Sequence, residues 1–220
     1  MAASAPAVAT PPPIPEMETA EISAAPVAQA LSRVESSSRD AKQTECESAV
    51  EMIVRYFGIV VLADLLRTSK TAQISDLRVS TRRPSAGLWV KIVREGLAVL
   101  GEEADEYIKL FSSPGTSRGI DKLVEMKNRA DSGSPGDIEQ EGKRFSNQLQ
   151  DIKVDLARMA GGSLVYMESA SIKGDGDFEY DMTVLEGLLP PRRENYKTKE
   201  KLATEQVYTL NRKSASLRSL

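Results

Sequence analysis

The sequence predicts an α+β protein that is mainly helical, with a five-helix bundle followed by a small antiparallel β-sheet. Two observations carry this prediction. Up to Gly162, apolar residues recur three and four positions apart, which is the period of helices buried on one face. After Gly162, aromatic and β-branched residues partly alternate with polar ones, as they do in half-buried strands. The change of period at a Gly-Gly pair therefore marks the boundary between the two parts.

The first predicted helix is central to the core. Residues 49–66 form a long apolar stretch that Glu51, Arg55 and Asp64 interrupt. A membrane span needs about 20 mostly apolar residues, so we interpret this stretch as a buried helix and expect no membrane association. Glu51 and Arg55 lie four positions apart, where their side chains can pair along the helix.

Four more helices are expected, each with start or stop signals. They cover residues 84–100, a short stretch at 107–111, residues 117–131 and residues 137–160. Pro84 and Ser85 open the first of these, and Trp89 lies on its apolar face, so we expect this side chain to be largely buried. In the last of them, Val154 lies off the main apolar face, which leaves a second surface that a partner could cover.

Strands are predicted at residues 164–172, 178–187, 205–212 and 214–220. A turn at Asp175-Gly176-Asp177 connects the first two, and Pro190–Pro191 begins a longer charged connection. These strands carry too little apolar surface for a full second core. We therefore expect the sheet to pack on the helices.

The first 30 residues are predicted to be a disordered tail. Six of the 11 prolines fall within residues 1–26, and alanines are scattered through residues 1–30 without an apolar block. Such a composition buries too little surface to offset chain entropy, and it lacks the features of a signal peptide. The expected organisation is a tail at 1–30, a helical domain at 31–162 and a β-rich part at 163–220.

The absence of histidine excludes much chemistry. The 220-residue chain has no histidine and one cysteine, Cys46, so neither a Ser-His-Asp nucleophile nor a typical zinc site can form. No glycine-rich phosphate or dinucleotide loop is present. The acidic run of Glu102, Glu103, Asp105 and Glu106 is typical of a solvated helix start. Cys46 is interpreted as a small core residue in a reducing, cytoplasmic compartment, and we expect no cofactor or metal.

The charge balance gives no overall footprint for nucleic acid. Three of the 32 acidic residues lie within residues 1–32, which contain no lysine or arginine; the remaining chain holds 29 acidic and 29 basic residues. A neutral body does not attract phosphate over long distances. Local basic patches remain at Arg82–Arg83 and Arg192–Arg193.

Alternating acids at residues 175–186 are similar to a calcium loop. Its sixth position needs a glycine for the sharp turn and holds Tyr180, and alternating acids are also typical of the solvated face of a strand. We favour the strand. The acids in question are Asp175, Asp177, Glu179, Asp181 and Glu186.

A more informative motif closes the helix at 117–131. The stretch Lys127-Asn128-Arg129-Ala130-Asp131-Ser132-Gly133 follows an amphipathic helix. Within a five-helix domain, it resembles the HEPN family, whose signature places an arginine, a polar residue such as asparagine and, after a short gap, a histidine. The helix order is similar as well, and the resemblance covers residues 28–160. In active HEPN ribonucleases the histidine acts on the proton of the attacking ribose hydroxyl, while the arginine holds the phosphate.

This chain departs from that signature at the reactive positions. Lys127 and Ser132 stand where active members carry arginine and histidine, and Asn128 is unchanged. A serine hydroxyl is no base near neutral pH, and lysine lacks the planar fork of arginine. A simpler interpretation is that Lys127, Asn128 and Arg129 are solvated residues that end a helix.

The resemblance implies a non-catalytic sensor, scaffold or dimerisation module of a bacterial signalling or defence system. It also implies a homodimer or a protein partner, contacted through residues 120–160. The alternative is a metal-independent endoribonuclease with an altered site, in which Lys127, Asn128 and Arg129 contact the phosphates of RNA.

Overall fold

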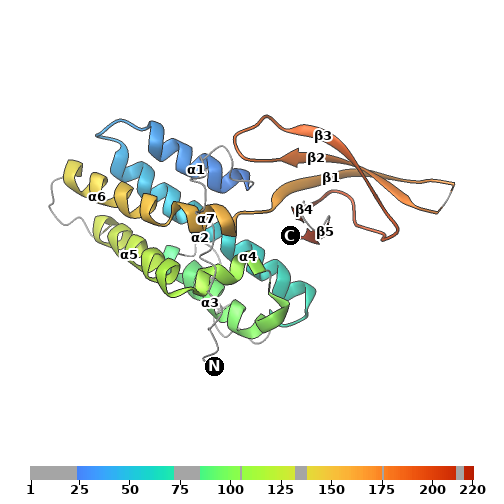
Figure 1. Cartoon of the computed structure of the whole chain (residues 1–220), viewed down its shortest axis with the longest axis horizontal. Coiled ribbons are helices and arrows are strands. Elements are labelled where there is room, and N and C mark those ends of the chain that lie inside the picture. The colour runs from blue at the N-terminus through green and yellow to red at the C-terminus, as the bar shows by residue number, and fades with distance from the viewer. Residues whose placement is uncertain (1–23, 72–84, 105, 132–137, 175, 212–215) are drawn as a thin grey trace, which may run out of the picture.

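The computed structural model describes residues 24–71, 85–104, 106–131, 138–174, 176–211 and 216–220. These residues form an α+β fold, mostly helical, with seven α-helices followed by an antiparallel sheet of five strands (Figure 1). The helices are α1 (Ala25–Ser36), α2 (Lys42–Arg67), α3 (Ala86–Leu100), α4 (Glu106–Lys109), α5 (Pro114–Asp131), α6 (Ile138–Asp151) and α7 (Lys153–Met159). Two 3₁₀ turns, Gly101–Glu103 and Leu110–Ser112, flank α4.

The helix α2 lies at the centre of the bundle, as the apolar stretch at 49–66 predicts. It packs against α1, α3, α5 and α6, and Phe57 and Leu65 are fully buried. The expected pair between Arg55 and Glu51 forms, with 2.7 Å between Arg55 Nη2 and Glu51 Oε1. In the part of the chain that the structure describes, no helix is long and apolar enough to cross a membrane.

Trp89 of α3 is buried against α2, which confirms the prediction for this residue. It is 9% exposed. A Cβ placed on Gly58 would lie 2.2 Å from Trp89 Cε3, so glycine at this position is what lets the indole approach the α2 backbone. Ser85 caps α3, because its hydroxyl accepts a hydrogen bond from the Leu88 backbone N–H at 3.3 Å.

The helix count differs from the five that were expected. Residues 25–30, predicted to be part of a disordered tail, lie in α1, where Val27, Ala28 and Ala30 are buried; residues 1–23 lie outside the described residues. The sequence did not predict α1, because the small apolar residues of this helix continue an alanine-rich stretch. The long helix expected at 137–160 is divided at Ile152 into α6 and α7. Val154, expected to leave a second surface, is half-buried.

The division at Ile152 coincides with a close contact to α5. A Cβ on Gly119 would lie 2.3 Å from Ile152 Cγ2, so this side chain occupies space that any residue other than glycine would fill. Ile152 is 5% exposed. A tertiary contact of this kind leaves no trace in local periodicity, which explains why the sequence predicted one continuous helix.

The sheet has the order β3-β2-β1-β4-β5, with all neighbours antiparallel. Its strands are β1 (Ser163–Ile172), β2 (Phe178–Leu185), β3 (Arg192–Thr198), β4 (Gln206–Asn211) and β5 (Ser216–Ser219). Four of these were predicted. The expected charged connection contains β3, whose sequence RRENYKT has no apolar alternation because it forms an edge of the sheet.

The sheet has an apolar cluster of its own, contrary to the expectation that it would depend on the helices. The connection before β4 helps to cover this cluster, because the Leu202 backbone N–H donates to Tyr180 Oη at 2.6 Å and Tyr208 Oη donates to the Ala203 carbonyl at 2.9 Å. The twist of the sheet and the loop that covers it allow a small number of side chains to bury one another. The buried residues of this apolar cluster are Val165, Met167, Tyr180, Met182, Val184, Tyr208 and Leu210.

The bundle and the sheet join at a small contact. The Ala24 backbone N–H donates to the Ala160 carbonyl at 3.0 Å, and Ala24 also forms an isolated bridge with Glu186. Leu164, at the start of β1, belongs to the helical core. Beyond this point, the strands β1, β2 and β3 extend away from the helices (Figure 1).

Candidate functional site

The motif residues lie in the last turns of α5, and the packing of that helix decides which way they face. Ile120, Leu123 and Val124 of α5 are buried in the bundle core. On another side, Arg94 Nη2 of α3 donates to Asp121 Oδ2 at 2.9 Å and to Ser117 Oγ at 2.7 Å. These contacts fix the rotation of α5 about its axis. The residues after Glu125 therefore lie in the last turn of α5, at the bundle surface.

Lys127 is held against α2. Its side chain is 14% exposed, and its Nζ lies 4.0 Å from Glu51 Oε2. Glu51 also accepts the hydrogen bond from Arg55, so one carboxylate faces two cations. The Lys127 ammonium group thus faces a carboxylate of the same chain, at the outer limit of an ion pair.

Arg129 and Asn128 face solvent. Arg129 Nη2 donates to Glu125 Oε1 at 2.6 Å, one turn earlier in α5, and both side chains are 64% exposed. Asn128 is exposed, and its side chain forms no hydrogen bond to the residues that the structure describes. Ser132 lies outside the described residues. The structure therefore brings Lys127, Asn128 and Arg129 to one helix end without joining them in one pocket.

A small hollow of about 50 Å³ adjoins the motif. Arg129 lines it, together with Gln43 of α2 and Arg144 of α6. The Oε1 atom of Gln43 is buried without a hydrogen-bond partner, while its Nε2 donates to Glu47 Oε1 at 2.9 Å. The hollow has room for about one or two waters, and it is too small for a nucleotide.

The site contains no imidazole that could transfer a proton near neutral pH. A cleaving site needs a group that takes a proton near neutral pH, a role that histidine fills in most such sites. The chain contains no histidine. Among the described residues, no group of three or more acidic or cysteine side chains could hold a metal ion.

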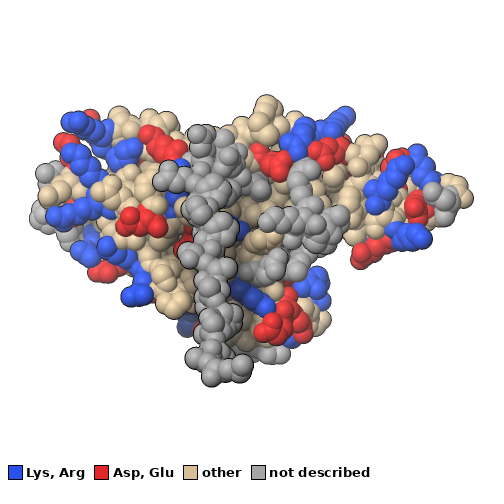
Figure 2. All heavy atoms as spheres, in the orientation of Figure 1, with Lys and Arg blue, Asp and Glu red and all other residues tan. Residues whose placement is uncertain are grey.

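The basic patch expected at Arg192–Arg193 is neutralised. Arg192 is 2.6 Å from both Glu186 Oε2 and Glu194 Oε1, and Arg193 lies 3.4 Å from Glu168 Oε2. Arg82 and Arg83 lie outside the described residues. On the face drawn in Figure 2, lysines and arginines alternate with acidic residues over bundle and sheet instead of forming one basic field.

Of the acidic residues that resemble a calcium loop, Glu179 and Asp181 lie in β2 and have other partners. Glu179 contacts Lys173 and Lys197, and the hydrogen bond from Lys173 lowers the pKa of that carboxyl. Asp181 accepts a hydrogen bond from Ser169 Oγ at 2.6 Å. These contacts support the interpretation of alternating acids as the polar face of a strand. Asp175 lies outside the described residues.

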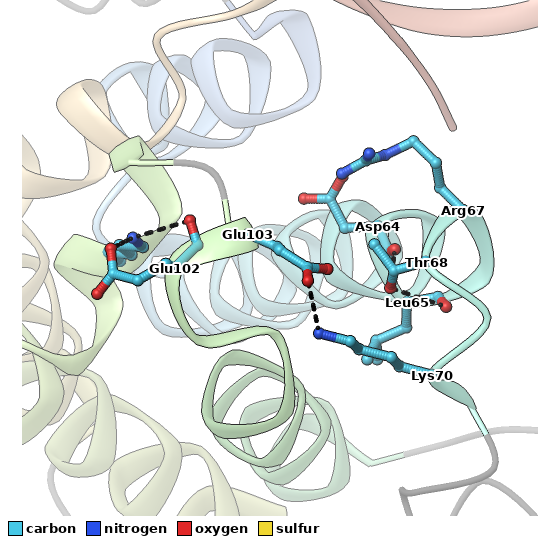
Figure 3. Close-up of polar contacts among 8 residues, drawn as sticks. Asp64, Leu65, Arg67, Thr68, Lys70, Glu102 and Glu103 are labelled. Carbon is cyan, nitrogen blue, oxygen red and sulfur yellow. Dashed lines mark hydrogen bonds and ion pairs between the residues drawn. The ribbon is translucent and has the colours of Figure 1, made fainter.

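Other polar groups form structural pairs where α2 ends (Figure 3). Asp64 is 4% exposed and lies 3.3 Å from Arg67 Nη2. Lys70 pairs with Glu103 at 3.0 Å, and Lys109 pairs with Glu102 at 3.1 Å. Both acids are exposed, as expected of a solvated run. The pairs connect α2 and α4 to the turn that follows α3.

Cys46 is confirmed as a core residue. Its side chain is fully buried in the cluster between α1 and α2. Burial raises the pKa of the thiol to about 11. The thiol is therefore protonated and unreactive near neutral pH.

Sequence reasoning missed the partner of Lys127. Glu125 stands four positions before Arg129, so that pair could have been predicted from helical spacing. Glu51 lies in a different helix, and only the packing of α5 on α2 brings it to Lys127.

No family model, no curated protein and no solved structure matches this chain.

Proposed function

We propose that this chain is a non-catalytic interaction module with a HEPN-like plan and a degenerate motif, acting by self-association in a bacterial signalling or defence system. The observation that carries the proposal is the pairing of both motif cations with carboxylates of the same chain, Lys127 with Glu51 and Arg129 with Glu125. Cations held in this way compensate nearby acids, and the absence of histidine leaves no imidazole beside them to act as a base near neutral pH.

A surface suited to association runs along α2. Met52, Ile59 and Leu66 are 36%, 44% and 68% exposed and lie seven positions apart, so they form one stripe on the helix. Glu51 connects this stripe to Lys127 of α5. The exposed apolar stripe and the degenerate motif therefore belong to neighbouring parts of the bundle surface.

The stripe is suited to a second copy of the same chain. Met52 and Leu66 are equally distant from Ile59 along α2. Two antiparallel copies can therefore place Ile59 against itself and Met52 of one copy against Leu66 of the other, as an isologous twofold interface requires. HEPN domains often pair through their motif helices, and α5 adjoins this stripe.

The alternative function, a metal-independent endoribonuclease, makes a different prediction. The test incubates the purified chain with structured and unstructured RNA in the presence of a chelator, beside a Lys127→Ala, Asn128→Ala double variant. We expect no cleavage by either protein. Cleavage by the wild type that disappears in a folded double variant would overturn the non-catalytic proposal. Cleavage of equal rate in both would assign it to a source other than the motif.

A further inference from the structure

A second hollow lies between α5 and the junction of α6 with α7, away from the motif. Its volume is about 390 Å³, and it is widely open to solvent. Arg118 and Lys122 of α5 line one side, and Asp151 and Asp155 line the other. The approach of Ile152 to Gly119 brings the two sides together.

Gln148 of α6 lines this hollow. The residue is 8% exposed and lines the hollow, and its Nε2 lies 3.7 Å from the position that a Cβ on Gly119 would take. Its side-chain amide has no hydrogen bond to any described residue, and neither of its polar atoms is both buried from solvent and without a partner. The amide is therefore accessible to water in the hollow, where a ligand can replace that water.

The carboxylate of Asp155 is oriented in advance. Fully buried Thr116 donates to Asp155 Oδ2 at 2.6 Å, and Ser113 Oγ donates to Thr116 Oγ1 at 2.7 Å. Because the threonine oxygen accepts from Ser113, its own proton is directed at Asp155. The linked hydrogen bonds of the Ser113 and Thr116 hydroxyls hold one oxygen of the Asp155 carboxylate in place. The other oxygen remains available to the hollow.

The two sides of the hollow carry opposite charges that do not meet. Arg118 donates from Nε to the Pro114 carbonyl at 2.9 Å. Among the described residues, neither Arg118 nor Lys122 forms an ion pair with Asp151 or Asp155. The four groups sum to zero charge. A ligand that satisfies both sides must therefore carry one group of each sign.

From these contacts we infer that the hollow binds a small zwitterion of the free amino-acid class. The ligand carboxylate lies toward Arg118 and Lys122, its ammonium group lies toward Asp151 and Asp155, and the Gln148 amide contacts the atoms between them. This inference goes beyond the proposed function and does not depend on it, because the hollow is complete within one chain.

The test is a titration followed by NMR of the full ¹⁵N-labelled chain. The probes are the individual L-amino acids at millimolar concentration, each beside its N-acetyl derivative and its amide, which carry one charge only. We expect at least one amino acid to shift the side-chain NH₂ signals of Gln148 and the backbone amide of Gly119. The two derivatives should shift them much less.

Two variants and a matched control sharpen the result. Lys122→Gln and Asp151→Asn should each weaken binding by about tenfold, the scale of one charged hydrogen bond. Lys143→Gln, on α6 but not lining the hollow, should leave binding unchanged. Absence of shifts with every amino acid would overturn the inference. Equal shifts with singly charged derivatives, or equal weakening in the Lys143 variant, would overturn it as well.

Discussion

Two residues at the α2–α3 contact show how closely the bundle is packed. The Trp89 ring covers the backbone of Gly58, and its Nε1 is buried without a hydrogen-bond partner. An unpaired indole N–H costs free energy, so the large apolar ring must contribute more than this cost. The contact decides how near α3 lies to the central helix.

We expect Trp89→Ala to lower the free energy of unfolding by ~3–5 kcal/mol, as other buried large-to-small replacements do. Gly58→Ala should cost ~1–3 kcal/mol, because its new methyl meets the ring. In the double variant the methyl enters space that the ring has left, so the two losses should be less than additive. Denaturant unfolding measures all three. Simple additivity, or a native emission maximum of a fully water-exposed tryptophan, would contradict the packing.

Cys46 gives a prediction with a defined pH dependence. Its pKa rises from 9.0 to about 11 in the folded chain, so the folded state keeps its proton where the unfolded chain loses it. This contribution to stability is complete below pH 9 and is lost as the pH rises through about 11. Stability of Cys46→Ala should fall less over this interval. In the native wild type, thiol labelling at pH 8 should be slow; rapid labelling would show that the thiol is accessible.

At the scale of elements, the sequence predicted those that local patterns encode. The Pro-Ser start and the apolar spacing of α3 are local, and so is the alternation in β1 and β2. In contrast, the polar edge strand β3 is stabilised by neighbours in the sheet, and the division at Ile152 depends on Gly119 of another helix. The same limit applies to the candidate site, since Glu51 reaches Lys127 only after α2 and α5 have packed.

The helix α1 is the clearest correction at this scale, and it can be tested with a matched pair. Leu31 is 2% exposed, whereas Arg33, two positions later, is exposed. We expect Leu31→Ala to cost ~2–5 kcal/mol and Arg33→Ala to change stability by less than about 0.5 kcal/mol. Thermal and denaturant unfolding report both. Small and equal effects would mean that α1 does not dock on α2.

At the scale of the whole molecule, the chain has two apolar clusters that meet near Ala24, Ala160 and Leu164. The α2 stripe and the end of α5 lie at the surface of the bundle. The sheet follows directly after the C-terminal end of α7 (Figure 1).

The most direct test of the account is the mass of the chain in solution, measured by light scattering at micromolar concentrations. We predict about twice the 24.0 kDa of one chain for the wild type, and a single chain for Ile59→Glu, which places a charge at the centre of the stripe. Ile172→Glu is the control, because Ile172 is 72% exposed at the end of β1 and lies outside both the stripe and residues 120–160; it should remain a dimer. A wild-type mass of 24.0 kDa at every concentration, or equal loss of the dimer in both variants, would contradict the account.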